Sequence, residues 1–157
     1  MRYILRQHEL SAEPPAVASP TVSLAELRRD PERWRSQSGP RAVRLTPTDA
    51  VEELAAELPF LSVVEVEFPS ASDGRGYSQA RLLRERLGFR GELRAVGAGV
   101  RQDQIFLLAR CGFDAFELAA GEDPEAARRA LARYDVAYQP GSSLFAVRRQ
   151  RFRGAGS

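Results

Sequence analysis

Residues 61–68, Leu61-Ser62-Val63-Val64-Glu65-Val66-Glu67-Phe68, decide how this chain folds. Valine is β-branched and favours extended backbone, so the segment is predicted to be a strand. Its two glutamates alternate with apolar side chains, and alternate residues of a strand point to opposite faces of the sheet. The sheet that contains this strand is therefore predicted to have one apolar face and one polar face.

The pattern of strands and helices repeats on both sides of this segment. Further strands are predicted at residues 42–45, 93–96 and 114–118. Helices are predicted from four apolar faces, which are Val51, Leu54 and Leu58; Ala80, Leu83 and Leu87; Ile105, Leu108 and Cys111; and Ala127, Leu131 and Tyr134. Strands that alternate with helices over short connections are typical of βαβ units, so we predict an α/β fold with a parallel sheet of about four βα units.

The two glutamates also help to distinguish between two arrangements of a parallel sheet. A sheet that helices cover on both faces is expected to be apolar throughout. The polar face therefore favours a partial β/α-barrel-like arrangement, in which this face lines a polar interior or meets a partner. A doubly wound three-layer sandwich is the alternative.

The length of 157 residues fits one domain, since domains cluster at roughly 100–150 residues. Residues 1–40 are predicted to be an N-terminal arm with a short helix, which starts at the Ser-x-x-Glu capping box of residues 23–26. The α/β domain is placed at residues 41–147. Residues 148–157 are predicted to be a flexible arginine-rich tail.

The composition excludes several kinds of site. The chain has one cysteine, one histidine and no lysine. These counts exclude an intrachain disulfide, a protein-held iron–sulfur cluster, a Cys/His zinc site and a Walker-type phosphate loop. We therefore predict that the chain holds no metal.

Charge and hydropathy bear on partners and location. The net charge of +2 is too small to predict nucleic-acid binding. No segment has the roughly 18 uninterrupted apolar residues that a membrane span needs, and the first residues lack the apolar stretch of a secretory signal. We expect a cytoplasmic protein with neither a nucleic-acid nor a membrane partner.

The loop after the central strand is the first candidate site. Its residues Asp73-Gly74-Arg75-Gly76-Tyr77-Ser78 lead into a helix that carries Arg81. Glycines let backbone N–H groups approach a ligand closely, and a helix N-terminus favours an anion. Arg75 and Arg81 would each add charge-assisted hydrogen bonds of roughly 1.5–3 kcal/mol. We predict a small-anion site here, with a simple turn and two solvated arginines as the alternative.

The loop after the next strand, Gly97-Ala98-Gly99-Val100-Arg101-Gln102-Asp103-Gln104, is the second candidate. Its Gly-x-Gly start has the placement of a dinucleotide-binding loop, but Gln102 takes the position of the third glycine. A plain turn between strand and helix is therefore favoured. Both loops follow parallel strands, so they are predicted to share one end of the sheet and one site.

These loops supply most of the candidate functional residues. Asp73 and Asp103 are candidate catalytic acids or bases. The candidate ligand-binding residues are Gly74, Arg75, Gly76, Tyr77, Ser78, Arg81, Arg94, Arg101 and Gln104. Cys111 lies at a helix C-terminus, which disfavours a thiolate, so it is predicted to be a packed core thiol. The aromatic residues predicted to be core are Trp34, Phe68, Phe89, Phe106, Phe113 and Phe116.

Four motifs in order resemble a known family. They are Asp73-Gly74-Arg75-Gly76-Tyr77-Ser78-Gln79-Ala80-Arg81-Leu82-Leu83-Arg84, Gly91-Glu92-Leu93-Arg94-Ala95-Val96-Gly97, Arg110-Cys111-Gly112-Phe113-Asp114-Ala115-Phe116 and Val136-Ala137-Tyr138-Gln139. Over residues 41–139 the chain resembles a bacterial domain-of-unknown-function family that is labelled as an oxidoreductase involved in sulfite reduction. That label rests on genes that neighbour assimilatory sulfite reductase.

The resemblance implies a role in sulfur assimilation and cysteine biosynthesis, with sulfite reductase as a partner. No flavin, nicotinamide or haem motif is visible, so the cofactor stays unknown. One hypothesis is an accessory protein that binds a small oxyanion or the reductase itself. The other is a small β/α enzyme, an oxidoreductase or acid–base enzyme, with an anionic or nucleotide-like substrate. An enclosed cavity that contains these residues would favour the enzyme, and a shallow surface would favour the accessory protein. The sequence does not decide whether the chain forms a homodimer.

Overall fold

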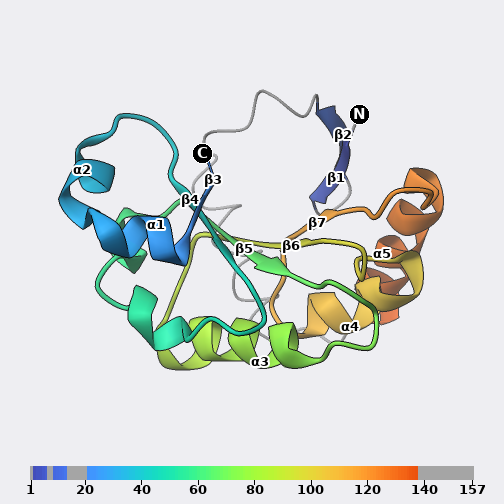
Figure 1. Ribbon diagram of the computed structural model, residues 1–157. Helices are drawn as coiled ribbons and strands as arrows, with labels where there is room; N and C mark the ends of the chain where they lie inside the picture. The colour runs from blue at the N-terminus through green and yellow to red at the C-terminus, as the bar shows by residue number, and fades with distance from the viewer. Residues whose placement is uncertain (1, 7–8, 14–20, 138–157) are drawn as a thin grey trace.

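The computed structural model describes residues 2–6, 9–13 and 21–137 and is built around one sheet (Figure 1). The strands are β1 (Arg2–Arg6), β2 (Glu9–Glu13), β3 (Thr21–Ser23), β4 (Ala42–Leu45), β5 (Val63–Glu67), β6 (Glu92–Val96) and β7 (Ala115–Glu117). Their spatial order is β2-β1-β7-β6-β5-β4-β3. The predicted tail at 148–157, and residues 138–147 of the predicted domain, lie outside the described residues.

The strand order identifies the kind of α/β fold. Strands β3 to β7 are parallel and lie side by side in chain order, while β1 and β2 are antiparallel additions beside β7. A doubly wound sheet reverses its strand order at a switch point, and this order does not reverse. The described edge strands β2 and β3 do not pair, so the sheet stays open instead of closing into a barrel. The predicted α/β fold with a mostly parallel sheet is confirmed.

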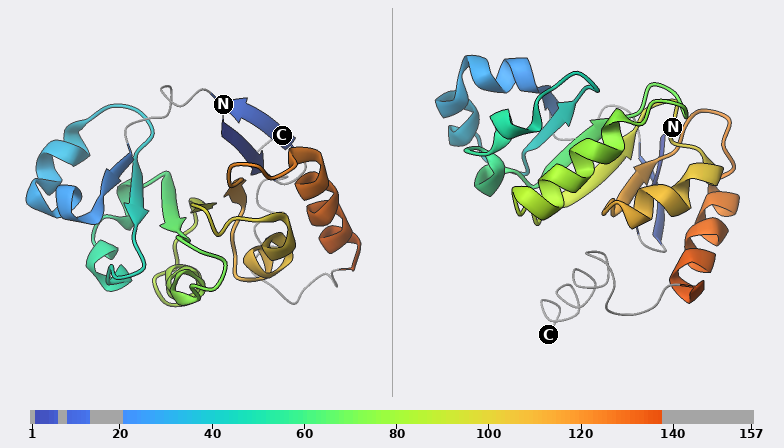
Figure 2. Two further views of the ribbon diagram at one scale, coloured as in Figure 1. Left: turned by 45° about the vertical axis from the view of Figure 1, so that its right-hand side comes forward. Right: turned by 90° about the horizontal axis from the view of Figure 1, so that it is seen from below.

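The helices lie along the outer side of the curved sheet (Figure 2). They are α1 (Leu24–Arg29), α2 (Pro31–Ser36), α3 (Arg75–Arg81), α4 (Ile105–Arg110) and α5 (Pro124–Ala137), and a π turn, η3 (Leu82–Arg86), continues α3. The short helix predicted from the capping box is α1, and both hydrogen bonds of that box, between Ser23 and Glu26, are present. In the described part of the chain, none of the helices has the length and apolar character needed to cross a membrane.

The single helix predicted after β4 is wrong. The structure has two 3-10 helices in its place, η1 (Val51–Leu54) and η2 (Leu58–Phe60). Pro59 disfavours the α conformation at Leu58, and in an α-helix its ring would clash with the carbonyl group of Ala55, so the end of the predicted helix cannot form a regular α-helical turn. The Asp49 carboxylate accepts a hydrogen bond from the N–H of Thr46 and so closes the turn before η1. The apolar residues of the predicted face are still buried.

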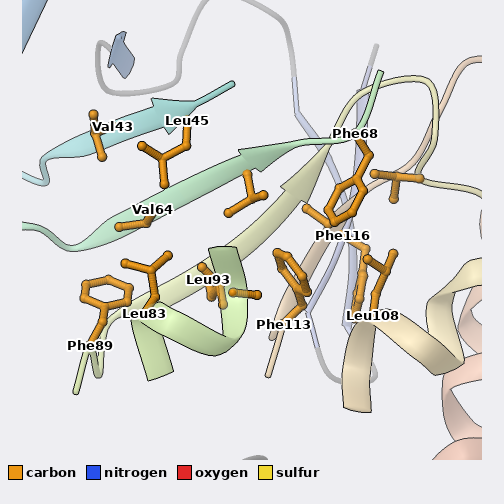
Figure 3. Close-up of a cluster of buried hydrophobic side chains, with 14 of the residues drawn as sticks. Val43, Leu45, Val64, Phe68, Leu83, Phe89, Leu93, Leu108, Phe113 and Phe116 are labelled. Atoms are coloured by element: carbon orange, nitrogen blue, oxygen red, sulfur yellow. The ribbon is translucent and has the colours of Figure 1, made fainter. Parts of the chain in front are cut away.

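One face of the sheet and the helices enclose a single core (Figure 3). The strands contribute alternate residues to it, which are Leu5, Val43, Leu45, Val64, Val66, Leu93, Ala95 and Phe116. Burial of each large apolar side chain stabilises the fold by roughly 1.5–3 kcal/mol. Of the six aromatic residues predicted to be core, five are buried. The prediction is wrong for Phe106, which is 43 % exposed on the side of α4 that faces away from the core.

The first forty residues contribute strands as well as the expected short helix. β1, β2 and β3 all belong to the sheet. Leu5 of β1 is fully buried and pairs in register with Phe116 of β7, and Leu10 of β2 packs against the same core. The N-terminal segment therefore extends the sheet beyond β7.

The opposite face of the sheet carries a row of charged side chains. The register places Arg44, Glu65 and Arg94 side by side on β4, β5 and β6. Glu65 is fully buried, and its two carboxylate oxygens accept hydrogen bonds from Arg44 Nε at 2.8 Å and Arg94 Nη1 at 3.2 Å. Glu92 extends the network to Arg94 at 2.6 Å and to Arg6 of β1 at 2.7 Å. The predicted polar face is confirmed.

A second buried cation, Arg84, joins the end of α3 to the segments that precede β6 and β7. Arg84 lies in the π turn and is 8 % exposed. Its guanidinium donates, at 2.9–3.1 Å, to the carbonyl oxygens of Phe89, Gly91 and Gly112 and to the carboxylate of Asp114. Asp114 also accepts a hydrogen bond from the N–H of Leu93 at 2.7 Å. This ion pair therefore connects the end of α3 with the starts of β6 and β7.

We expect Arg84→Ala to lower the free energy of unfolding by about 3–5 kcal/mol. The substitution leaves the mostly buried carboxylate of Asp114 without this cation, and three carbonyl oxygens without its N–H groups. Urea denaturation followed by circular dichroism measures the change. Arg86→Ala is the matched control, because Arg86 is exposed on the same turn, and it should change stability by no more than about 0.5 kcal/mol. Equal stability of the two variants would contradict the role given to Arg84.

Candidate functional site

The two loops that were predicted to share a site meet at the carboxyl-terminal edge of the sheet. The first loop follows β5 and the second follows β6, and these strands are parallel neighbours. The N–H of Phe68 donates to the carbonyl oxygen of Val96 at 2.8 Å, and the N–H of Gly99 donates to that of Phe68 at 2.8 Å. The predicted placement of both loops at one end of the sheet is confirmed.

Gly97 and Gly99 make this contact between the loops possible. A Cβ atom on Gly97 would lie 2.5 Å from the carbonyl oxygen of Phe68, and one on Gly99 would lie 2.5 Å from that of Ser70. Gly97 also has a φ of 106°, a left-handed conformation that strains other residues. Packing between the loops therefore accounts for both glycines without a dinucleotide.

Asp73 and Arg75 build the start of α3. Asp73 Oδ1 accepts a hydrogen bond from the backbone N–H of Arg75 at 3.1 Å, and the two side chains form a bidentate ion pair at 3.0 and 2.7 Å. The hydrogen bonds from the Arg75 side chain and backbone hold the pKa of Asp73 below its usual value. The carboxylate of Asp73 thus occupies the place predicted for a bound anion, and the Arg75 side chain remains 59 % exposed.

Tyr77 joins the two loops through its hydroxyl group. The hydroxyl donates to Oε1 of Gln104 at 3.0 Å. The tyrosine ring packs edge-on against Phe68, with ring centroids 5.2 Å apart. The same Phe68 ring leaves no room for a side chain at Gly76, where a Cβ atom would lie 2.6 Å from it. Burial raises the pKa of Tyr77, so the hydroxyl stays protonated and can serve as the donor.

Ser78 and Arg81 lie on the outer side of α3, away from the core. Together with Leu82, Glu85 and Arg86 they line a shallow hollow of about 430 Å³. Ser78 and Arg81 are both exposed. The residues of the second loop lie outside the lining of this hollow, so it does not bring the two predicted loops together.

Cys111 follows the last residue of α4 and is half-buried rather than fully packed. Burial raises the pKa of its thiol, and the nearby Arg81 and Arg110 offset only part of this increase. The thiol is therefore protonated near neutral pH, which agrees with the prediction that Cys111 is not a nucleophile.

The remaining candidate residues lie in two different places. Arg101 pairs with Glu122 of the loop after β7 at 3.3 Å and is 58 % exposed, and Asp103 is exposed on the same edge. Arg94 lies apart from them, because its side chain joins the charged row on the face opposite the helices, where it pairs with Glu65. The structure thus brings Tyr77 and Gln104 together and separates Arg94 from both loops.

One residue at this edge was missed by the sequence analysis. Gln79 lies on the buried side of α3, and its Nε2 donates to the carbonyl oxygens of Thr46 at 2.8 Å and Asp49 at 3.1 Å. It therefore ties the loop after β4 to α3. Its position next to Ala80, on the core side of the helix, is the signal that could have identified it, because a glutamine buried there needs hydrogen-bond partners.

Together these residues form an open edge of exposed charges. Arg75 and Arg101 are each more than half exposed. A general base needs a pKa near the working pH, and the pKa of Asp73 is shifted away from neutrality. Among residues 2–6, 9–13 and 21–137, no three metal-ligating side chains come together. The arrangement can present fixed charges and hydrogen-bonding groups to a partner.

Comparison with known proteins finds one family. Residues 42–144 match the model of a family described as "Bacterial protein of unknown function (DUF934)". The match covers more than half of the chain and includes both loops of the carboxyl-terminal edge, α3 and α4. No curated protein and no solved structure is similar enough to match.

We expect Gly97→Ala to lower the free energy of unfolding by at least about 1–2 kcal/mol, because the left-handed backbone alone costs this much in other residues. The new Cβ would also meet the Phe68 backbone, which cannot move aside as a flexible side chain could. Thermal unfolding measures the change. Gly74→Ala is the matched control, because Gly74 has a φ of −87° and open space around its Cα. A Gly97→Ala protein as stable as the Gly74→Ala protein would contradict the packing argument.

We expect Cys111 to react slowly with iodoacetamide, with a rate that keeps rising above about pH 8.5, the ordinary pKa of a cysteine thiol. The thiolate is the reactive form, and burial delays its formation as the pH rises. The pH profile of the alkylation rate locates the pKa. Arg81→Ala should move the profile to still higher pH, because Arg81 favours the thiolate. A midpoint at or below that of the denatured protein would show that the thiol is activated.

Proposed function

We propose that this chain, which belongs to the DUF934 family of bacterial proteins, is an accessory protein of assimilatory sulfite reduction that docks onto the sulfite reductase. The docking surface is the carboxyl-terminal edge of the sheet, with the loops that follow β5 and β6. The four sequence motifs and the label of the family that they resemble suggest the process. The geometry of the edge suggests docking.

The observation that carries the docking role is a set of exposed charges held in fixed positions. The Arg75 side chain is 59 % exposed but oriented by two hydrogen bonds to Asp73, and the Arg101 side chain is 58 % exposed but oriented by Glu122. Side chains that are already ordered lose less conformational entropy when a partner binds. An open edge with such side chains suits a large partner.

A small oxyanion fits this edge less well than a protein does. The Asp73 carboxylate already lies beside the N–H and the guanidinium of Arg75, so an incoming anion would meet a negative charge there. An enzyme is also less well supported. Neither Asp73 nor Asp103 lines the hollow on α3, and exposed residues such as Arg75 and Asp103 keep both loops in contact with water.

The proposal is tested in the bacterium that encodes the chain. We expect a deletion strain to fail to grow on sulfate or sulfite and to grow normally on sulfide, because only the reduction of sulfite is affected. The tagged chain should co-purify with sulfite reductase subunits from cells grown on sulfate. Growth of the deletion strain on sulfite, together with no reductase in the purified sample, would refute the proposal.

Variants at the edge test the docking surface. Arg75→Ala and Arg101→Ala should each cost roughly 1.5–3 kcal/mol of binding free energy, about ten- to a hundredfold in affinity, if these arginines contact the reductase. Arg128→Ala is the matched control, because Arg128 is 43 % exposed and is also oriented by an acidic partner, Glu125. Surface plasmon resonance with the purified reductase measures the three affinities. Equal losses in all three variants would point to a general charge effect instead.

A further inference from the structure

Two apolar side chains of α4 face solvent. Phe106 is 43 % exposed and Leu107 is 46 % exposed, although the neighbouring Ile105 and Leu108 are buried in the core. The guanidinium of Arg110 lies 5.8 Å from the centre of the Phe106 ring. Exposed aromatic and aliphatic side chains next to arginine are typical of the surfaces at which proteins bind other proteins.

Unpaired positive charges surround these apolar side chains. Arg81, Arg86 and Arg110 form no ion pair within the part of the chain that the structure describes, whereas Arg75 and Arg101 at the neighbouring edge do. Figures 1 and 2 show α3 and α4 side by side. Arg81 of α3 and Arg110 of α4 both act electrostatically on Cys111, the residue after α4, so both arginines lie near that residue.

The α3–α4 surface, defined as Arg81, Glu85, Arg86, Phe106, Leu107 and Arg110, is thus apolar and basic together. Three arginines and one glutamate give it a net charge of +2. The shallow hollow of about 430 Å³ on α3 lies at its rim, where Arg81, Glu85 and Arg86 are among the lining residues. A binding partner must therefore supply negative charge and at least one apolar side chain.

We propose that the α3–α4 surface binds an acidic, amphipathic segment of the partner protein, with partner carboxylates on the arginines and an apolar side chain against Leu107. This inference rests on the proposed docking function and extends the docking surface from the edge onto the helices. The exposed Leu107 favours a protein over a nucleic acid, because a phosphate backbone supplies negative charge but no apolar side chain. The three arginines of the surface form no ion pair with any described residue, so they can bind partner carboxylates beside the exposed apolar side chains.

The test uses the full chain, purified sulfite reductase and two test variants, each with its own control variant. We expect the double variant Arg81→Glu/Arg110→Glu to bind the reductase at least tenfold more weakly than the parent, and Leu107→Ala to bind several-fold more weakly. Arg29→Glu and Phe60→Ala are the matched controls and should bind like the parent. Arg29 is exposed on α1 with no ion pair to any described residue, and Phe60 is 42 % exposed. Circular dichroism melting checks that all variants fold.

Each outcome decides a different point. Loss of binding in the α3–α4 variants alone supports the inference. Binding by these variants that equals the parent's overturns the inference and leaves the proposed docking function standing. Failure of the parent chain to bind the reductase overturns both. Binding that disappears on nuclease treatment would show that the surface takes RNA instead, which also overturns the inference.

Discussion

The burial of Glu65 is the constraint on which the sheet depends. A buried carboxylate is costly unless its charge is paired and hydrogen-bonded, and Glu65 receives one guanidinium from the strand on each side. Alternate residues face opposite ways, so a shift of β4 or β6 by one residue would remove Arg44 or Arg94 from this face and leave the charge unpaired. The ion pairs therefore specify the register of three parallel strands, while the apolar face supplies the driving force for folding.

The register of these strands also positions the candidate site. Because Glu67 pairs with Val96 at the ends of β5 and β6, Phe68 emerges beside Gly97 and donates to the carbonyl oxygen of Val96. Glycine at position 97 lets the two backbones touch, and the Phe68 ring then packs on Tyr77. The hydrogen bond between Tyr77 and Gln104 follows from this chain of contacts. An interaction in the middle of the sheet thus determines how the loops meet at its edge.

The parts of the structure that could be predicted from sequence are those that depend on local pattern. The alternation around Glu65 predicted a strand with a polar face, and the order of elements placed both loops at one edge. The pairing of β1 with β7 could not be predicted, because it joins segments far apart in the chain. Arg84 could not be distinguished from the exposed arginines of its helix, since its partner Asp114 lies beyond the next strand. The ion pair of Asp73 with Arg75 depends on side-chain rotamers, which a residue pattern does not specify.

The open sheet agrees with the docking role that we propose for the carboxyl-terminal edge. In a closed β/α barrel the loops after the strands form a ring around a pocket, and that ring encloses a small substrate. Here the parallel strands end at β3 on one side and meet the antiparallel β1 on the other. The loops after β4, β5, β6 and β7 therefore form a line, which Gln79, Tyr77 and Glu122 join by hydrogen bonds. Loops that hydrogen-bond to one another in a line form a long contact surface without enclosing a volume. Small ligands bind in concave pockets, whereas an extended protein partner can contact the whole length of such a surface.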